Sequence, residues 1–160
     1  MGLAHGPADG NRAEDGVNAP LLLRDCVPED SDAVAALWTA CGLVVPWNDP
    51  FADIALALSK PNATILLGTL DGRIVASAMA GQEGHRGWIY YVAVDPAQQG
   101  HGYGRRMVEA AEAWLREAGM PKVQLLVRET NQRVLAFYET LGYARSPATM
   151  MQKWLTKPSP

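Results

Sequence analysis

The sequence predicts a single α/β domain in which helices pack on a mixed β-sheet. Its 160 residues suit one domain, and 48% apolar residues are enough to build a core at that length. Strand-like and helix-like segments alternate after residue 20, with no internal repeat and no interior linker. An Asp-Gly turn predicts antiparallel neighbours, whereas a later helix between two strand-like segments predicts parallel ones.

Residues 1–20 differ in composition from the rest of the chain. They are rich in Gly, Ala, Asp, Asn and Pro and lack the apolar centre of a secretory signal. We predict a disordered tail at 1–20 and a domain at 21–160. No apolar run reaches the ~18 residues that a membrane span requires, and Cys26 and Cys41 form no C-x-x-C pair. We therefore expect a cytoplasmic protein with reduced thiols and no membrane association.

The N-terminal part predicts one strand and two helices. The strand covers residues 21–26, and Asp30 or Ser31 can cap the helix that follows. Asp49 can cap a second helix, with Pro50 at its first position. Apolar residues recur at helical spacing in both segments, namely Val34, Leu37, Trp38 and Cys41 in the first and Phe51, Ile54, Ala55 and Leu58 in the second.

A β-hairpin is the clearest local feature in the middle of the chain. Residues 64–70 and 73–81 have the composition of strands, and Asp71-Gly72 between them is a strong hairpin signal. A polar loop follows, and residues 88–94 then form the next predicted strand.

The C-terminal half adds two helices and a parallel strand. The helix at 104–118 is amphipathic, with one apolar face made of Met107, Val108, Ala111, Trp114, Leu115 and Ala118. It acts as a crossover, so a strand at 122–127 should run parallel to the strand before the helix. A last helix begins at Thr130 or Asn131, with Val134, Leu135, Tyr138 and Leu141 on one side. Residues 143–155 can supply one or two closing strands.

A glycine-rich loop lies between the strand at 88–94 and the helix at 104–118. It reads Gln99-Gly100-His101-Gly102-Tyr103-Gly104. Three glycines in five positions leave the backbone unobstructed, and successive N–H groups can turn toward one point. The next helix directs its own free N–H groups and the positive end of its dipole to the same place. Such a corner favours a phosphate group.

Two other interpretations of this loop fit less well. A plain surface turn would also use glycine. A dinucleotide-binding fingerprint requires a third glycine where Arg105 stands, and it requires the glycines directly after the strand, whereas five residues separate Val94 from Gly100. A Walker loop would end in Gly-Lys-Ser or Gly-Lys-Thr, which this loop lacks.

Two linked motifs resemble the GNAT superfamily of N-acetyltransferases. Gln99-x-x-Gly102-x-Gly104 fits its Q/R-x-x-G-x-G/A loop, and the segment 91–96, Tyr-Val-Ala-Val-Asp-Pro, resembles the strand before that loop. Asn131 and the run Phe137-Tyr138-Glu139-x-x-Gly142-Tyr143 resemble the second family motif. The resemblance covers residues 21 to about 155. Pro46-Trp47-Asn48-Asp49-Pro50 and Gly84-His85-Arg86-Gly87 resemble the bacterial YpeA-type branch.

The resemblance implies the acyl-CoA N-acyltransferase fold, a mixed and mostly antiparallel central sheet flanked by helices. It also implies acetyl-CoA as co-substrate, with its pyrophosphate bound by the residues Gln99, Gly100, His101, Gly102, Tyr103, Gly104 and Arg105. Backbone N–H groups suit a diphosphate because they donate regardless of pH. Arg105 and Arg106 lie where the helix dipole disfavours cations, so they are either solvated charges or offset by a bound phosphate.

In that family the central strand and its parallel neighbour separate, and the pantetheine arm lies between them. By resemblance, the main-chain groups of Val92 and Val94 pair with this arm. One N–H near Val92 would face the thioester carbonyl and stabilise the oxyanion formed on attack. Asn131 resembles the asparagine that contacts the arm, although the same residue suits a helix N-cap.

Tyr138 matches the family tyrosine that protonates the departing thiolate. An unperturbed phenol has a pKa of ~10 and is a proton donor at neutral pH. The alternative is core packing, because Tyr138 shares an apolar face with Val134 and Leu141.

The general base and the acceptor site are less defined. The strand at 88–94 has no carboxylate, and Leu126 stands where some family members place one. Candidates in adjoining loops are Glu83, His85 and Glu129, each of which can equally be a solvated loop residue. Deprotonation through water, aided by Tyr90 or Tyr91, stays open. Residues that can present an aromatic wall and carboxylates to a cationic amine are Trp47, Asp49, Asp53 and Glu83.

These observations favour an N-acetyltransferase that moves an acetyl group from acetyl-CoA to a small-molecule or peptide amine by direct attack. The alternatives are a non-catalytic acyl-CoA-binding regulatory module and an enzyme of the same fold with a hydroxyl acceptor. A net charge of -3 without a basic block argues against a nucleic-acid partner. Three scattered histidines suggest no metal site. A homodimer is left open.

Overall fold

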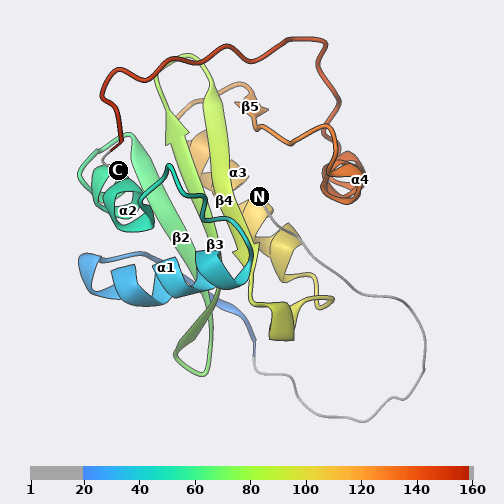
Figure 1. Ribbon diagram of the computed structural model, residues 1–160. Coiled ribbons are helices and arrows are strands. Elements are labelled where there is room, and N and C mark those ends of the chain that lie inside the picture. Colours follow the sequence, from blue (N-terminus) through green and yellow to red (C-terminus); the bar gives the residue numbers. More distant parts are fainter. Residues whose placement is uncertain (1–19, 159–160) are drawn as a thin grey trace.

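The computed structural model describes residues 20–158. The predicted N-terminal tail, apart from residue 20, lies outside the described residues. One five-stranded sheet, in the order β1-β2-β3-β4-β5, forms the centre of the domain. Helices α1 and α2 lie on one side of the sheet and α3 on the other, while the segment that follows α4 passes over the upper end (Figure 1).

The strands are β1 (Leu22–Asp25), β2 (Ala63–Leu70), β3 (Arg73–Gln82), β4 (Gly87–Val94) and β5 (Val123–Gln124). The α-helices are α1 (Ser31–Ala40), α2 (Pro50–Leu58), α3 (Tyr103–Glu117) and α4 (Gln132–Thr140). Two short 3-10 helices are η1 (Pro28–Asp30) and η2 (Pro96–Gln98). Within residues 20–158, no helix is both long and apolar enough to cross a bilayer.

The predicted hairpin and the predicted parallel pair are both confirmed. Asp71 and Gly72 have φ values of 49° and 78°, and β2 and β3 are antiparallel from Leu70↔Arg73 onward. Positive φ at both central residues is the requirement of a type I′ turn. Strands β1 to β4 are antiparallel neighbours, and β5 runs parallel to β4. The sheet is therefore mixed and mostly antiparallel, as expected.

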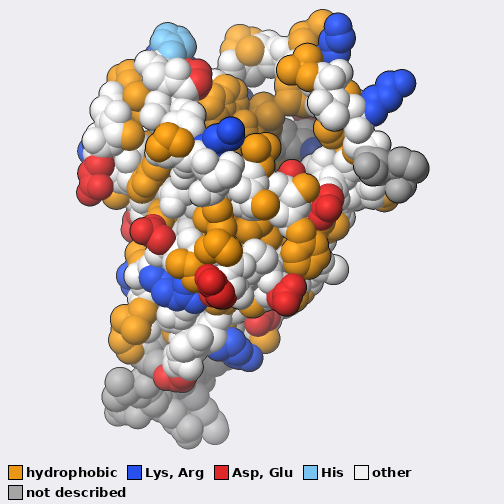
Figure 2. Space-filling model, turned by 90° about the vertical axis from the view of Figure 1, so that its left-hand side faces the viewer, with side chains coloured by type: hydrophobic (Ala, Val, Ile, Leu, Met, Phe, Trp, Pro, Cys, Tyr) orange, Lys and Arg blue, Asp and Glu red, His pale blue; other side chains and the backbone are white. Residues whose placement is uncertain are grey.

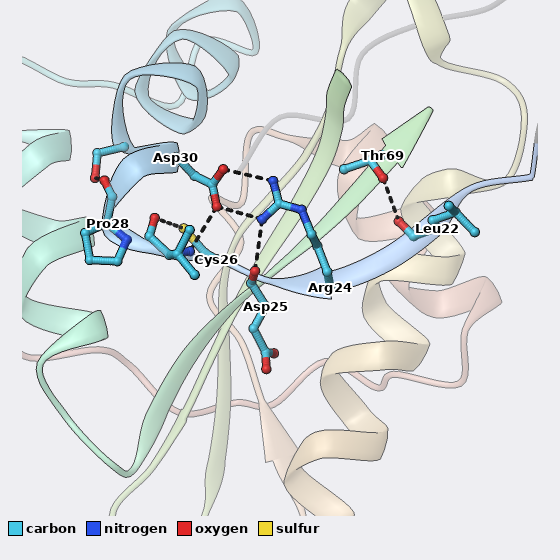
Figure 3. Close-up of polar contacts among 9 residues, drawn as sticks. Leu22, Arg24, Asp25, Cys26, Pro28, Asp30 and Thr69 are labelled. Atoms are coloured by element: carbon cyan, nitrogen blue, oxygen red, sulfur yellow. Dashed lines mark hydrogen bonds and ion pairs between the residues drawn. The ribbon is translucent and has the colours of Figure 1, made fainter. Parts of the chain in front are cut away.

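One helix cap is confirmed and another is wrong. Asp49 accepts a hydrogen bond from the Phe51 N–H at 2.9 Å and begins α2. The side chain of Asp30 makes no capping bond to α1, and Ser31, the alternative, is the first residue of the helix and donates its hydroxyl to the Pro28 carbonyl at 2.7 Å. Asp30 instead accepts two hydrogen bonds from the Arg24 guanidinium, at 2.7 and 2.8 Å, and one from the Val27 N–H at 2.9 Å (Figure 3). The Arg24 hydrogen bond lowers the pKa of Asp30, and the pair ties β1 to the turn before α1.

The core consists of two groups of buried side chains, one on each face of the sheet. On the α3 face, Met107, Val108, Ala111 and Leu115 are buried as predicted, whereas Ala118 is exposed. On the α1–α2 face, the buried residues of the helices include Val34, Leu37, Trp38, Ile54 and Ala57. Phe51 and Ala55 are exposed, contrary to the prediction, because α2 buries only the narrow stripe around Ile54 and Ala57 against the sheet.

The sheet ends earlier than the sequence predicts. The strand expected at 122–127 is reduced to Val123–Gln124, and the closing strands expected within 143–155 are not formed, since residues 141–158 contain no strand. β5 contacts β4 only at Gly87↔Val123 and Trp88↔Gln124. Because β5 has only two residues, it offers few backbone N–H and C=O groups with which residues 143–155 could pair. Without such a partner, the strand propensity of residues 143–155 is not enough to form a strand. The C-terminal segment instead crosses toward α2 (Figure 1).

Candidate active site

A large cavity lies where β4 and β5 separate. Their ladder ends at Trp88↔Gln124, and beyond it the wall is formed by Tyr90 and Tyr91 on one side and residues 126–129 on the other. The cavity has a volume of about 1340 Å³. Other lining residues come from the α1–α2 loop, from α2 and from the segment 146–150. The separation of the two strands, which the family resemblance implied, is therefore present.

On the outer face of the molecule that bears α1 and α2, the described residues form no block of one charge (Figure 2). Figure 2 shows the side that bears α1 and α2, where basic and acidic side chains are interspersed with hydrophobic ones. Two large hydrophobic side chains of α2, Phe51 and Leu56, are exposed.

The glycine loop adopts a conformation that requires glycine. Gly100 and Gly102 have φ values of 83° and 79°, and Gly102 is the N-cap of α3. A Cβ at either position would meet no atom within 4 Å. The glycines are thus needed for the left-handed backbone and not for close packing.

Free backbone donors point out of the start of α3. The first hydrogen bond of the helix runs from the Arg106 N–H to the Gly102 carbonyl at 3.1 Å. In the described part of the protein, the N–H groups of Tyr103, Gly104 and Arg105 have no acceptor. Together with the positive end of the helix dipole they can bind an anion. The Arg105 side chain is half-exposed and lies 4.0 Å from Glu109 one turn later.

Two side chains of the glycine loop, Gln99 and His101, make hydrogen bonds to backbone carbonyls near the loop. The Gln99 amide donates to the Val94 carbonyl at 3.1 Å, and the Cys41 thiol donates to the same oxygen at 3.1 Å. His101 contacts the Gln98 carbonyl at 3.1 Å, and its ring stacks on Tyr103. Cys41 also lines the cavity, so the Val94 carbonyl is bonded to one residue of the loop and to one residue of the cavity wall.

A β-bulge occurs in β4 beside the cavity. Ser77 is paired with Ala93 and Met79 with Tyr90, so Tyr91 and Val92 together oppose a single residue of β3. Tyr91 has a φ of 49°, in the left-handed region. Neither residue of the bulge has a partner on β3 or β5, which leaves the backbone at Val92 outside both ladders.

The Tyr91 hydroxyl contacts a carboxylate that the sequence did not connect with it. It donates to Asp53 Oδ2 at 2.5 Å, and both residues line the cavity. Burial raises the pKa of Tyr91 well above its usual value, and the Asp53 carboxylate raises it further. The sequence marked both residues as candidates, but no local pattern joins positions 53 and 91.

Tyr138 lies in the core between α4 and the sheet. It is 3% exposed, and its ring makes edge contacts with Phe137 and Tyr143. Burial raises its pKa well above the usual phenol value. Its ring is not part of the cavity wall. Tyr138 therefore packs in the core, as the apolar face of α4 suggested.

Asn131 is the N-cap of α4, as one of its two interpretations predicted. Its Oδ1 accepts a hydrogen bond from the Val134 N–H at 3.3 Å, and the residue also lines the cavity. Trp47 lines the cavity as well, whereas Asp49 is occupied in capping α2.

The candidate bases are distributed unevenly. Glu129 lines the cavity. Glu83 and His85 lie in the β3–β4 loop, outside the cavity wall, where Glu83 accepts from the Arg86 N–H at 2.6 Å and the Arg86 guanidinium donates to the His85 carbonyl at 2.9 Å. No group of three or more potential metal ligands occurs among the residues that the structure describes.

Comparisons with known proteins agree on one family. The profile described as "Acetyltransferase (GNAT) family" matches residues 31–143. The protein is 38% identical over 127 residues to an acetyltransferase of Yersinia pestis (79% of this chain, 90% of the relative) and 41% identical over 115 residues to one of Pectobacterium atrosepticum (72% and 82%). A Trypanosoma brucei acetyltransferase structure, 26% identical, superposes with a TM-score of 0.68 over 84% of this chain and all of that one. The chain therefore belongs to the acetyltransferase (GNAT) family.

Proposed function

We propose that this protein transfers the acetyl group of acetyl-CoA to a primary amine by direct attack, with both substrates bound at once. The observation that carries the proposal is the junction at Val94. The carbonyl of Val94 accepts hydrogen bonds from Gln99 of the glycine loop and from Cys41 of the cavity wall, which supports one extended ligand that reaches from the anion site toward the cavity. Coenzyme A has that form, with a charged pyrophosphate at one end and an acyl thioester at the other.

The residues of the protein fit this donor. The free N–H groups at the start of α3 and the left-handed Gly100 and Gly102 suit the pyrophosphate. The proposed group comprises Gln99, Gly100, His101, Gly102, Tyr103, Gly104 and Arg105. Within this group, the Gln99 side chain donates to the Val94 carbonyl. Because this carbonyl is already engaged, Val92 is a better candidate than Val94 for backbone pairing with the pantetheine arm of the coenzyme.

Acetyl-CoA supplies an activated thioester carbonyl. The main-chain N–H beside the bulge at Val92 would donate to its oxygen, and such a donor is worth ~3 kcal/mol in the transition state of other acyl transfers. Neither cysteine needs to act as a nucleophile. Burial raises the pKa of both Cys26 and Cys41, which disfavours the thiolate.

The acceptor amine is proposed to enter through the remainder of the cavity. Asp53 and Glu129 supply carboxylates there, and Trp47 supplies an aromatic surface. A carboxylate can hold the incoming ammonium group before it loses its proton. Asn131 is proposed to contact the arm of the coenzyme while it caps α4.

Tyr138 is proposed as the acid that protonates the departing thiolate. The phenol is protonated at neutral pH, as an acid requires, although burial raises its pKa and so makes it a weaker acid. Its position in the core equally supports a packing role, and substitution by phenylalanine distinguishes the two.

The experiment is an amine-panel assay. Purified protein is incubated with acetyl-CoA and small-molecule or peptide amines, with thiol release and product mass as readouts. Amide products support the proposal. Tight binding of acetyl-CoA with no product from any amine would favour the second candidate, a regulatory acyl-CoA-binding module. An ester product would indicate a hydroxyl acceptor.

A further inference from the structure

The bulge of β4 is held from the α1–α2 face of the sheet. Trp38 on α1 and Ser77 on β3 are both 0% exposed. The Trp38 indole N–H donates to Ser77 Oγ at 2.9 Å, and the Ser77 hydroxyl donates to the Tyr91 carbonyl at 3.0 Å. The single proton of the serine is therefore directed at the bulge, because its oxygen already accepts the indole bond.

The same tryptophan also holds the Tyr91 side chain. The two rings stack in parallel, with centroids 3.7 Å apart and an interplanar angle of 5°. The far end of Tyr91 is fixed by Asp53 on α2. Contacts from α1, α2 and β3 therefore converge on one residue of β4.

That residue has a backbone conformation that needs such support. Tyr91 has a φ of 49°, and a bulky side chain rarely occupies this region. A conformation of this kind persists only where its surroundings determine it. The bulge also decides which way the next amide points, because it interrupts the alternation of backbone groups along the strand.

We propose that Ser77, oriented by Trp38, is a positioning residue for acyl transfer. Its hydroxyl holds Tyr91 in the left-handed conformation and thereby aims the Val92 N–H at the cavity. The inference rests on the proposed function, since that N–H matters for turnover only if an acyl carbonyl binds there. Ser77 itself touches neither substrate.

The test compares Ser77→Ala with a matched control, Thr69→Val. Thr69 is the other buried hydroxyl of the sheet, 6% exposed, and its contact is the Leu22 carbonyl at 3.4 Å, away from the bulge (Figure 3). Both variants lose one buried hydroxyl. We expect Ser77→Ala to lower kcat at least tenfold with less than a threefold change in the KM for acetyl-CoA, and Thr69→Val to leave both within twofold.

Crystal structures of the two variants provide a readout independent of activity. We expect Tyr91 to leave the left-handed region in Ser77→Ala and to keep it in Thr69→Val. If Ser77→Ala retains the bulge, or if its kcat falls no further than that of Thr69→Val, the inference is wrong. Should Ser77→Ala fail to fold, Trp38→Phe keeps a ring against Tyr91 but removes the indole donor, and the same two readouts apply.

The wild-type protein separates this inference from the proposed function. If it transfers acetyl to no acceptor, the proposed function and the catalytic meaning of the bulge both fail. If it is active and only the Ser77→Ala comparison gives the contrary result, the proposed function stands and the role of Ser77 is refuted.

Discussion

The Tyr91 hydroxyl donates a 2.5 Å hydrogen bond to the Asp53 carboxylate across the wall of the cavity. The bond joins α2 to β4 and engages one of the two carboxylate oxygens of Asp53. A negative charge fixed in this way beside a cavity favours a cationic acceptor.

We expect Asp53→Asn to reduce kcat/KM for cationic amines about tenfold, because the ammonium loses its counter-charge. The KM for acetyl-CoA should stay unchanged. Steady-state kinetics with each substrate varied in turn will measure both. Asp32→Asn, at an exposed position on α1, is the matched control. Equal effects of the two substitutions would contradict a specific role for Asp53.

Gly102→Ala should weaken acetyl-CoA binding. The φ of 79° at Gly102 is unfavourable for alanine by about 1–2 kcal/mol, so the loop would relax and its N–H groups would lose their direction. Gly142→Ala, after α4, is a close control, because Gly142 has a φ of 91° and equally open surroundings. Calorimetric titration with coenzyme A should show weaker binding only for Gly102→Ala, whereas thermal unfolding should show similar destabilisation of both variants.

Tyr138→Phe removes one oxygen and little packing. If the phenol is the acid, kcat should fall at least tenfold throughout pH 6–9, since the raised pKa keeps the wild-type group protonated across that range. A pH profile of kcat for both proteins measures this. Unchanged turnover would assign Tyr138 to the core alone.

Half-buried Tyr143 should make the fold sensitive to alkali. Burial raises the pKa of Tyr143, and its hydrogen bond to Glu112 at 2.7 Å raises it further. The folded state therefore holds this proton more tightly than the unfolded state does. The contribution of Tyr143 to the free energy of unfolding is therefore complete below pH ~10, the unperturbed pKa of tyrosine. This contribution decreases as the pH rises above that value. Tyr143→Phe should show a smaller loss of unfolding free energy between pH 8 and 11 in urea titrations.

Features determined by single residues or short motifs could be predicted from the sequence. Asp71-Gly72 fixed the hairpin because both residues accept positive φ, and Asp49 and Asn131 capped their helices as expected. The glycine loop stands between β4 and α3 with the left-handed glycines that an anion site uses. These features depend on backbone preference over a few residues.

Features that depend on distant residues were decided by the tertiary structure. Asp30 bonds Arg24 instead of capping α1, and the closing strands do not form, because each outcome depends on which neighbour is within reach. The bulge at Tyr91 also depends on residues that are distant in the sequence. Trp38 and Ser77 are 39 positions apart and Asp53 and Tyr91 are 38 apart, so only the packing of the helices on the sheet brings their polar atoms within hydrogen-bond distance. The sequence alone therefore determined the fold class and the glycine loop, through local backbone chemistry, and the packed tertiary structure decided the shape of the cavity wall.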